Sequence, residues 1–172
     1  VVNGGIINAY GSNTRLGEGE WVVVEADESD GTFLRLRPAV AVITNIDPEH
    51  LDHYGNIEGL HQAFQTFAES VPFYGAAVLC LDHPVLQAML PRLTGKKVLS
   101  YGFSPQADLR ADSLRFDGAS SIFDVFIHGT MHADVHLPML GRHNVQNALA
   151  AIAVAHHLGL AESVWRQGLA NY

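Results

Sequence analysis

The chain has 172 residues, of which 48% are hydrophobic and 16% are charged, and its formal net charge is −8. This much apolar material is enough for the core of one ordinary domain, so a disordered chain is not expected. An acidic chain does not attract a polyanion and no apolar run has the length of a membrane span, so neither a nucleic acid nor a membrane is expected as a partner.

Three short apolar runs predict strands that are covered on both faces, because their apolar residues are uninterrupted rather than alternating. They are Trp21–Ala26, Ala39–Thr44 and Ala76–Leu81. The single cysteine, Cys80, lies in the third run, where it cannot form an internal disulfide and is expected to be a buried, unreactive thiol. A reducing, cytoplasmic compartment fits this cysteine usage best.

Helical segments separate the later apolar runs. Residues 57–71 carry apolar side chains at helical spacing, with Asn56 as a possible cap and Pro72 after the last turn. A short helix over Pro84–Leu90 and a strand over Lys97–Tyr101 are expected next. This alternation predicts the α/β class, with a mostly parallel sheet and crossover helices.

The pattern changes in the second half of the chain. Leu109–Phe116, Ser121–His128 and Met131–Leu137 alternate apolar and polar residues, which predicts antiparallel β-hairpins with one wet face. An alanine-rich helix over His143–Leu158 follows, with Gly159 as its C-cap, and a last helix is expected over Glu162–Leu169.

Both ends of the chain have the character of cut boundaries. Val1 is not a methionine and opens directly into an apolar stretch, and Tyr172 follows directly after a predicted helix. We therefore expect the chain to be one piece of a longer protein.

The first polar cluster follows the first predicted strand. Glu25, Asp27, Glu28 and Asp30 place four carboxylates within six residues. In open parallel sheets ligands gather at the carboxyl ends of strands, and carboxylate oxygens suit a hard cation such as Mg²⁺. The other interpretation is a solvated acidic turn that caps the next helix.

Two further clusters occupy comparable places. Residues 44–53 follow the second predicted strand and include His50, which could ligate a metal or contact a phosphate, or could be an ordinary loop histidine. Asn144 and Asn147 lie three residues apart in the first turn of the alanine-rich helix, so both face the same side. Their amides suit the edge of an adenine ring, although Asn144 could simply cap the helix.

A histidine site is the rival hypothesis. The chain has ten histidines, and His128, His132 and His136 are spaced four apart, which makes a zinc or nickel site conceivable. Strand alternation instead puts His132, Asp134 and His136 together on the wet outer face of a hairpin.

Four stretches of the chain, taken in order, resemble the Mur ligases, the ATP-dependent amide-bond ligases of peptidoglycan synthesis. These stretches are EADESDGTFL, TNIDPEHLDHYG, VPFYGAAVLCLD and LGRHNVQNALAAIAVA. The EADESD form resembles the alanine-adding members. The resemblance implies a central, P-loop-type ATP-binding domain, ATP and Mg²⁺ as cofactors, and UDP-N-acetylmuramate and L-alanine as substrates. The related ligase that recycles murein tripeptide is the alternative within the family.

The same resemblance implies roles for particular residues. Glu25 and His50 match residues that hold magnesium near the γ-phosphate of ATP. His143, Asn144 and Asn147 match family residues that contact ATP. The segment Gly11–Gly17 resembles a loop near the muramate substrate, which makes Asn13 and Arg15 candidate substrate contacts.

The chain departs from the family at one important point. The glycine-rich Gly-x-x-Gly-Lys-Thr loop that cradles the phosphates has no counterpart here, since Thr94–Lys97 holds only a Gly-Lys pair before a strand. The N-terminal uridine-nucleotide domain and the C-terminal domain are also absent from residues 1–172. We therefore expect the isolated chain to be inactive, and a non-catalytic globular fragment is the alternative function.

Overall fold

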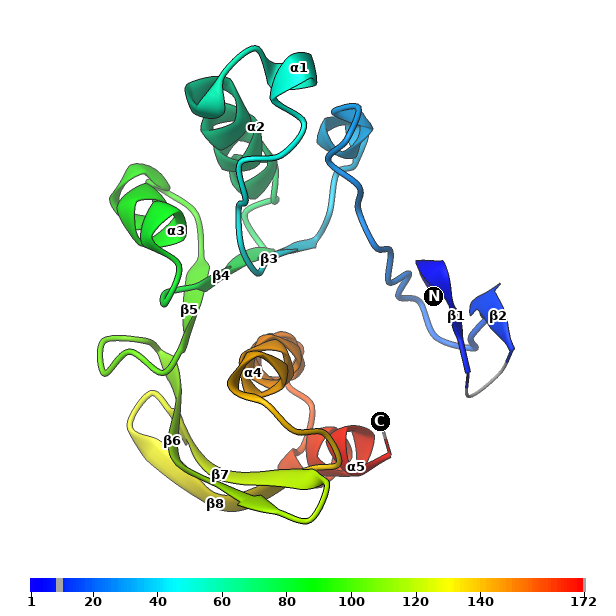
Figure 1. The fold of residues 1–172 in the computed structure, drawn as a ribbon, viewed down its shortest axis with the longest axis vertical. Helices are drawn as coiled ribbons and strands as arrows, with labels where there is room; N and C mark the ends of the chain where they lie inside the picture. Colours follow the sequence, from blue (N-terminus) through cyan, green and yellow to red (C-terminus); the bar gives the residue numbers. More distant parts are fainter. Residues whose placement is uncertain (9–10, 172) are drawn as a thin grey trace.

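A computed structural model describes residues 1–8 and 11–171 of the chain (Figure 1). Its elements are, in chain order, β1 (Val2–Ile7), β2 (Ser12–Thr14), η1 (Thr32–Arg35), β3 (Val40–Ile43), α1 (Leu51–Tyr54), α2 (Ile57–Glu69), β4 (Ala76–Cys80), α3 (Pro84–Met89), η2 (Leu90–Arg92), β5 (Val98–Gly102), β6 (Leu109–Asp117), β7 (Ser120–Ile127), β8 (Thr130–Leu137), α4 (Arg142–His157) and α5 (Glu162–Ala170).

The main sheet has six strands in the order β3-β4-β5-β6-β7-β8. The pairs from β3 to β6 are parallel, and β6, β7 and β8 pair in antiparallel fashion. The predicted α/β class, with a mostly parallel sheet and added hairpins, is confirmed. The hairpins form no separate layer, because β6 continues the parallel part directly and then starts the antiparallel part.

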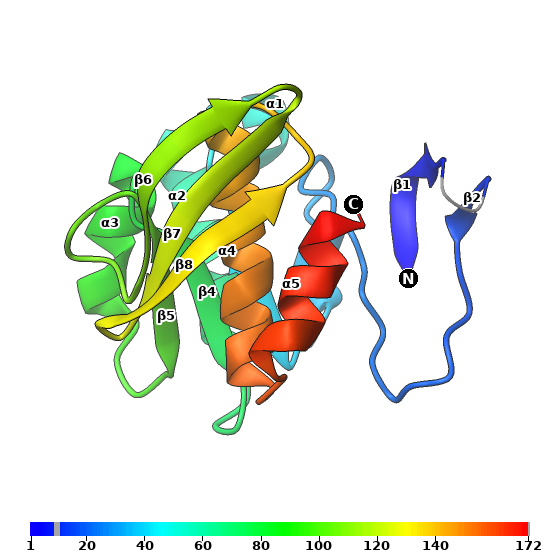
Figure 2. The same cartoon turned by 90° about the horizontal axis from the view of Figure 1, so that it is seen from below.

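Helices cover both faces of this sheet. α2 and α3 lie against β3 and β4 on one face, while α4 and α5 lie in the concave face that the curved sheet forms (Figures 1 and 2). All five residues of β4 are buried because layers lie on both sides of it. Cys80, at its end, is buried as expected, and burial raises the pKa of its thiol.

Helix α2 forms as its sequence predicts. The side-chain oxygen of Asn56 accepts a 2.8 Å hydrogen bond from the backbone N–H of Gly59, which caps the helix. Phe64 and Phe67 point inward, and each ring centroid lies within 5.3 Å of the centroid of Phe33 from η1. These contacts hold the acidic loop before η1 close to α2.

The prediction of a first strand over Trp21–Ala26 is wrong. Trp21–Ala26 forms no strand of the sheet and makes only an isolated parallel bridge between Val24 and Val2. Residues 21–24 are 45–72% exposed. A buried strand needs partners at its edges and layers on its faces, and within the described residues this run has only the bridge to Val2 and stays exposed.

The last strand corrects a second prediction. Between Phe123 and Val125 the pairing with β8 slips by one residue, and Asp134 adopts a left-handed φ of 53°. This bulge places His132 opposite the buried Val125, so His132 faces α5, whereas His136 lies on the outer face. His132 and His136 therefore do not share a wet face, and the three spaced histidines cannot surround one metal ion.

Candidate functional site

The carboxyl ends of β3, β4 and β5 meet the start of α4 at one edge of the sheet. Asp82, just after β4, organises this edge. Its carboxylate accepts hydrogen bonds from the backbone N–H groups of Phe103 and Ser104 at 2.8 and 2.9 Å, and from Nε2 of Gln146 at 2.6 Å. The loop after β5 and the first turn of α4 are thus held by the same carboxylate.

The start of α4 exposes polar groups at this edge. Gly141 precedes the helix with φ 107°, and no side chain caps the helix. The amide nitrogen of Asn144 donates a 2.8 Å hydrogen bond to the carbonyl of Leu140. The interpretation of Asn144 as the N-cap is therefore wrong: it lies inside the first turn, and its amide steadies the segment before the helix. His143, one residue earlier, is exposed.

Asn147 lies one turn further along α4. Its exposed side chain lines a groove of about 420 Å³ together with Thr44, which follows β3, and with Val42. The groove continues along α4 over alanine and valine side chains. An amide and a hydroxyl at the mouth of a partly apolar groove are suited to an aromatic ring with polar edges.

His50 lies in the loop between β3 and α1. Its backbone is left-handed, with φ 55°, and its carbonyl accepts hydrogen bonds from His53 and Tyr54 in the single turn of α1. Ligand atoms of Glu28, Glu49 and His50 all lie within 4.8 Å of one another. The hydroxyl of Tyr54 also donates to the carbonyl of Glu28, which ties the acidic loop to α1.

Glu25 lies outside this three-residue group. Its carboxylate accepts a 2.6 Å hydrogen bond from the backbone N–H of Gly4 and is exposed. The structure therefore brings His50 together with Glu28 and Glu49, and does not bring it together with Glu25.

The two aspartates of the acidic loop have a local role. Asp27 accepts from the backbone N–H of Ser29, and Asp30 accepts from the backbone and hydroxyl of Thr32. Hydrogen bonds from Ser29 and from Thr32 lower the pKa of Asp27 and of Asp30, respectively. The acidic-turn interpretation thus describes Asp27 and Asp30, whereas Glu28 turns toward His50.

Asn13 and Arg15 lie elsewhere in the molecule. Asn13 belongs to β2, and the backbone N–H of Arg15 donates to Val1. The β1–β2 pair stands apart from the six-stranded sheet in both views (Figures 1 and 2). These two residues are not brought to the edge that holds His50 and Asn147.

The sequence predicts only part of this edge. Glu28 and Glu49 adjoin the predicted residues Glu25 and His50, but nothing in their spacing favours them over Glu25. The link between Asp82 and Gln146 joins residues 64 positions apart and has no local signal.

Comparisons with known proteins agree on one family. The profile of the Mur ligase middle domain matches residues 9–155. A UDP-N-acetylmuramate–L-alanine ligase from Agrobacterium fabrum is 60% identical over the whole of this chain, which covers 38% of that relative. This chain thus spans well under half the length of the curated relative.

Two solved structures share the fold. The UDP-N-acetylmuramate–alanine ligase MurC from Thermotoga maritima superposes with a TM-score of 0.83 at 26% identity, over 98% of this chain and 37% of that one. UDP-N-acetylmuramate:L-alanyl-γ-D-glutamyl-meso-diaminopimelate ligase from Neisseria meningitides gives the same TM-score at 28% identity, over 98% and 55%. Within the described residues, no helix has the length and hydrophobicity needed to cross a membrane.

Proposed function

Because this chain belongs to the Mur ligase family, we propose that it is the central, ATP-binding part of a cytoplasmic ligase that joins L-alanine to UDP-N-acetylmuramate in peptidoglycan synthesis. The 60% identity to the Agrobacterium fabrum ligase over the whole chain carries this proposal. The phosphate-binding loop, the uridine-nucleotide domain and the C-terminal domain would belong to the remainder of the parent protein.

The proposed reaction has two chemical steps. The lactyl carboxylate of UDP-N-acetylmuramate attacks the γ-phosphorus of ATP, which forms an acyl phosphate and releases ADP. The amine of L-alanine then attacks the acyl carbon, and the tetrahedral intermediate collapses to the amide with loss of phosphate. The contribution of this chain is to position the reactants and to offset the phosphate charge.

His50 and Glu25 are the proposed magnesium ligands. When bound there, Mg²⁺ would supply positive charge beside the γ-phosphate. The donor set around His50 fits a divalent cation, because two carboxylates converge with the imidazole. Glu25 would have to exchange its hydrogen bond with Gly4 for the metal, whereas Glu28 and Glu49 already face His50. Histidine is an unusual ligand for a hard cation, so its role rests on the family resemblance.

The start of α4 is the proposed adenine site. Asn147 is exposed at the groove beside Thr44, and Asn144 and His143 lie one turn earlier. An amide can donate and accept at once, as the six-amino group and ring nitrogen of adenine require. Asn13 and Arg15 are proposed to approach the muramate substrate, which requires the β1–β2 pair to lie beside it in the parent.

The test is an assay of the full-length parent. ATP, UDP-N-acetylmuramate and labelled L-alanine should give one labelled UDP-muramoyl product and one ADP per amide formed. The matched reaction replaces L-alanine by the tripeptide L-alanyl-γ-D-glutamyl-meso-diaminopimelate. A higher kcat/KM for the tripeptide would overturn the proposal in favour of the recycling ligase, and no product with either acceptor would exclude both.

A further inference from the structure

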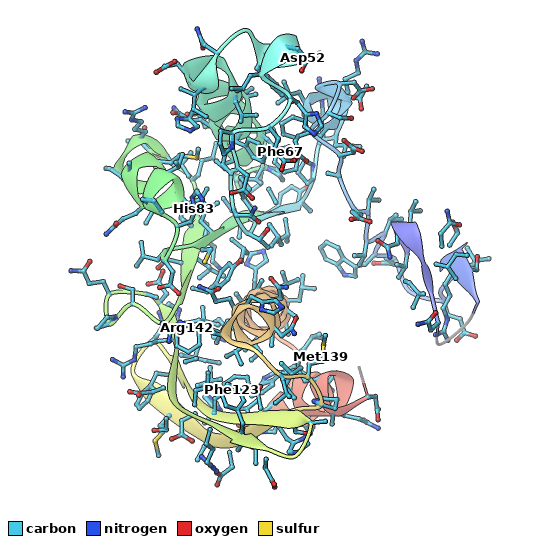
Figure 3. All side chains as sticks on the ribbon, viewed as in Figure 1. Asp52, Phe67, His83, Phe123, Met139 and Arg142 are labelled. Carbon is cyan, nitrogen blue, oxygen red and sulfur yellow. The ribbon has the colours of Figure 1, made fainter. Side chains whose placement is uncertain are left out.

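Asn3 and Gly4 form the only Asn-Gly pair of the sequence, and both lie in β1. β1 pairs with β2 at Val2 and at Ile7, and the pairing is irregular between these two positions. In Figure 3 the side chains of the β1–β2 pair stand apart from those of the six-stranded sheet, and Gly4 is exposed. The Asn-Gly pair is therefore accessible to water and is not fixed by a regular ladder.

The side chain of Asn3 is folded over the residue that follows it. Its amide nitrogen donates a 3.3 Å hydrogen bond to the carbonyl of Gly5, so the carboxamide lies along the backbone of Gly4. A bond between Cγ of Asn3 and the backbone nitrogen of Gly4 would close a five-membered ring. Rotation about the single bonds of Asn3 is enough to bring these two atoms together, and Gly4 has no side chain that would hinder their approach.

The carboxylate of Glu25 contacts the same backbone nitrogen. Its Oε2 accepts a 2.6 Å hydrogen bond from the N–H of Gly4, and a Cβ at Gly4 would lie 3.1 Å from this oxygen. Backbone hydrogen bonds hold the two segments together: the N–H of Val2 donates to Val23 at 2.8 Å, and the N–H of Glu25 donates to Val2 at 2.9 Å. A general base must lie about 2.6–3.2 Å from the atom whose proton it takes, and Glu25 meets this condition.

We propose that Asn3 is a site of self-catalysed deamidation, in which Glu25 acts as the base. The backbone nitrogen of Gly4 attacks Cγ of Asn3, and the proton of this nitrogen passes to Glu25. The bond between Cγ and Nδ2 breaks, and Nδ2 takes the proton from Glu25 and leaves as ammonia. The product is a succinimide ring. Water then adds to one of the two ring carbonyls, and the ring opens to aspartate or isoaspartate.

Both products change the surroundings of Glu25. Each adds a carboxylate close to that of Glu25, and like charges repel, so the contact between β1 and residues 23–25 should loosen. Isoaspartate also adds a methylene group to the backbone of β1. The inference goes beyond the proposed ligase function and does not depend on it, because the reaction needs only Asn3, Gly4, Glu25 and water.

Incubation of the 172-residue chain at neutral pH, followed by peptide mass spectrometry over several days, tests the proposal. Conversion of Asn3 changes the mass of its peptide, and chromatography separates the isoaspartate form. Glu25→Gln keeps an oxygen that can accept the hydrogen bond of Gly4 but removes the base, so it should slow the conversion by about tenfold or more. Glu20→Gln, at an exposed glutamate of the same segment, is the matched control and should leave the rate unchanged.

Asn56, which caps α2, is the internal control in every sample. Conversion of Asn3 that is faster than that of Asn56, and that slows in Glu25→Gln but not in Glu20→Gln, supports the proposal. If the hydrogen bond only held the amide proton in place, Glu25→Gln would convert as fast as wild type or faster, which would overturn it. Equal rates at Asn3 and Asn56, or equal slowing in the two variants, would also overturn it. Because Glu25 is exposed, both variants should keep the fold, and far-UV circular dichroism checks this.

Discussion

The side chain of Gln146 donates a 2.6 Å hydrogen bond to the carboxylate of Asp82, and so joins the first turn of α4 to the end of β4. The backbone after β5 folds around the same carboxylate: a Cβ on Gly102 would lie 2.7 Å from it. Gly102 also has a φ of 154°, which side chains rarely allow. One exposed aspartate therefore sets the distance between three loops of the candidate site.

Replacement of Asp82 should loosen this edge. Asp82→Ala removes the acceptor of two backbone N–H groups and of Gln146. Hydrogen bonds to a charged group predict a loss of about 1–3 kcal/mol in the free energy of unfolding. Urea unfolding of the chain measures this loss, with Asp117→Ala at the exposed end of β6 as the control. Equal stabilities of the two variants would show that the carboxylate does not hold the loops.

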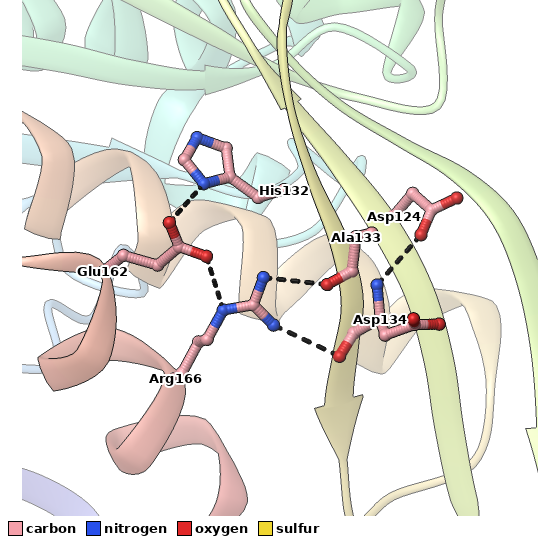
Figure 4. Close-up of polar contacts among 6 residues, drawn as sticks. All are labelled: Asp124, His132, Ala133, Asp134, Glu162 and Arg166. Carbon is pink, nitrogen blue, oxygen red and sulfur yellow. Dashed lines mark hydrogen bonds and ion pairs between the residues drawn. The ribbon is translucent and has the colours of Figure 1, made fainter.

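The contacts of Glu162 should make the free energy of unfolding depend on pH. In Figure 4, Glu162 accepts a 2.6 Å hydrogen bond from Nε of Arg166 and lies 2.7 Å from Nδ1 of His132. Arg166 also donates to the carbonyls of Ala133 and Asp134, so α5 is fastened to β8 at its bulge. The hydrogen bond from Arg166, followed by that from His132, lowers the pKa of Glu162 below its ordinary value of 4.5.

The sign of this effect follows from the lowered pKa. The stabilisation is fully present above the unfolded-state pKa and is lost as the pH falls through the folded-state pKa. Glu162→Gln should therefore reduce the loss of stability on acidification below about pH 4.5. The difference between the variant and wild type should be small, because the Glu162 side chain is 43% exposed and water screens its ion pairs. Urea unfolding at several pH values tests this. If the free energy of unfolding of Glu162→Gln falls below pH 4.5 as steeply as that of wild type, the prediction is contradicted. Glu18→Gln, in the loop after β2, is the control.

The isolated chain should neither hydrolyse ATP nor form the amide. The Gly-x-x-Gly-Lys-Thr loop that binds the phosphates is absent from residues 1–172. A coupled assay for ADP should give the rate of the blank reaction. ADP release above that rate, lost in Glu25→Ala, would contradict the assignment of these residues to an incomplete site.

Magnesium ligation should be visible in the full-length parent. Glu25→Ala and His50→Ala should each lower kcat by about a hundredfold or more while the fold is kept, because the phosphate charge is then no longer offset. Glu28→Ala tests the geometry seen here, in which Glu28 faces His50. If Glu25→Ala keeps a near-normal kcat at saturating Mg²⁺ while Glu28→Ala loses most of its kcat, the carboxylate ligand is Glu28 and not Glu25.

Local patterns predicted those elements whose partners lie within this chain. The apolar run of β4 and the helical spacing of α2 agree with the structure because both segments pack against elements that the chain contains. Trp21–Ala26 has the same apolar character as β4 but lacks such partners, so the same pattern gives an exposed segment. The prediction that His132 and His136 share one face of β8 is wrong because of the bulge. The bulge depends on a cross-strand contact, in which the N–H of Asp134 donates to Asp124 at 3.0 Å.

The sequence predicts which loops form the candidate site, but not which side chains of those loops contact one another. The positions of His50 and Asn147 at strand and helix ends followed from the order of the elements. Which carboxylate reaches His50 depends on the turn that Asp27 and Asp30 form and on the contact of Tyr54 with Glu28. Sequence spacing contains neither of these distances.

The ATP affinity of Asn147→Ala in the full-length parent tests the central claim, that this chain carries the nucleotide site of a ligase. If the amide faces adenine, its loss should weaken ATP binding by roughly 0.5–1.5 kcal/mol. Gln167→Ala on α5 is the matched control and should leave the affinity unchanged. Alanine is the better helix former, so a purely structural Asn147 predicts a raised Tm instead. An unchanged ATP affinity together with a raised Tm would contradict the claim.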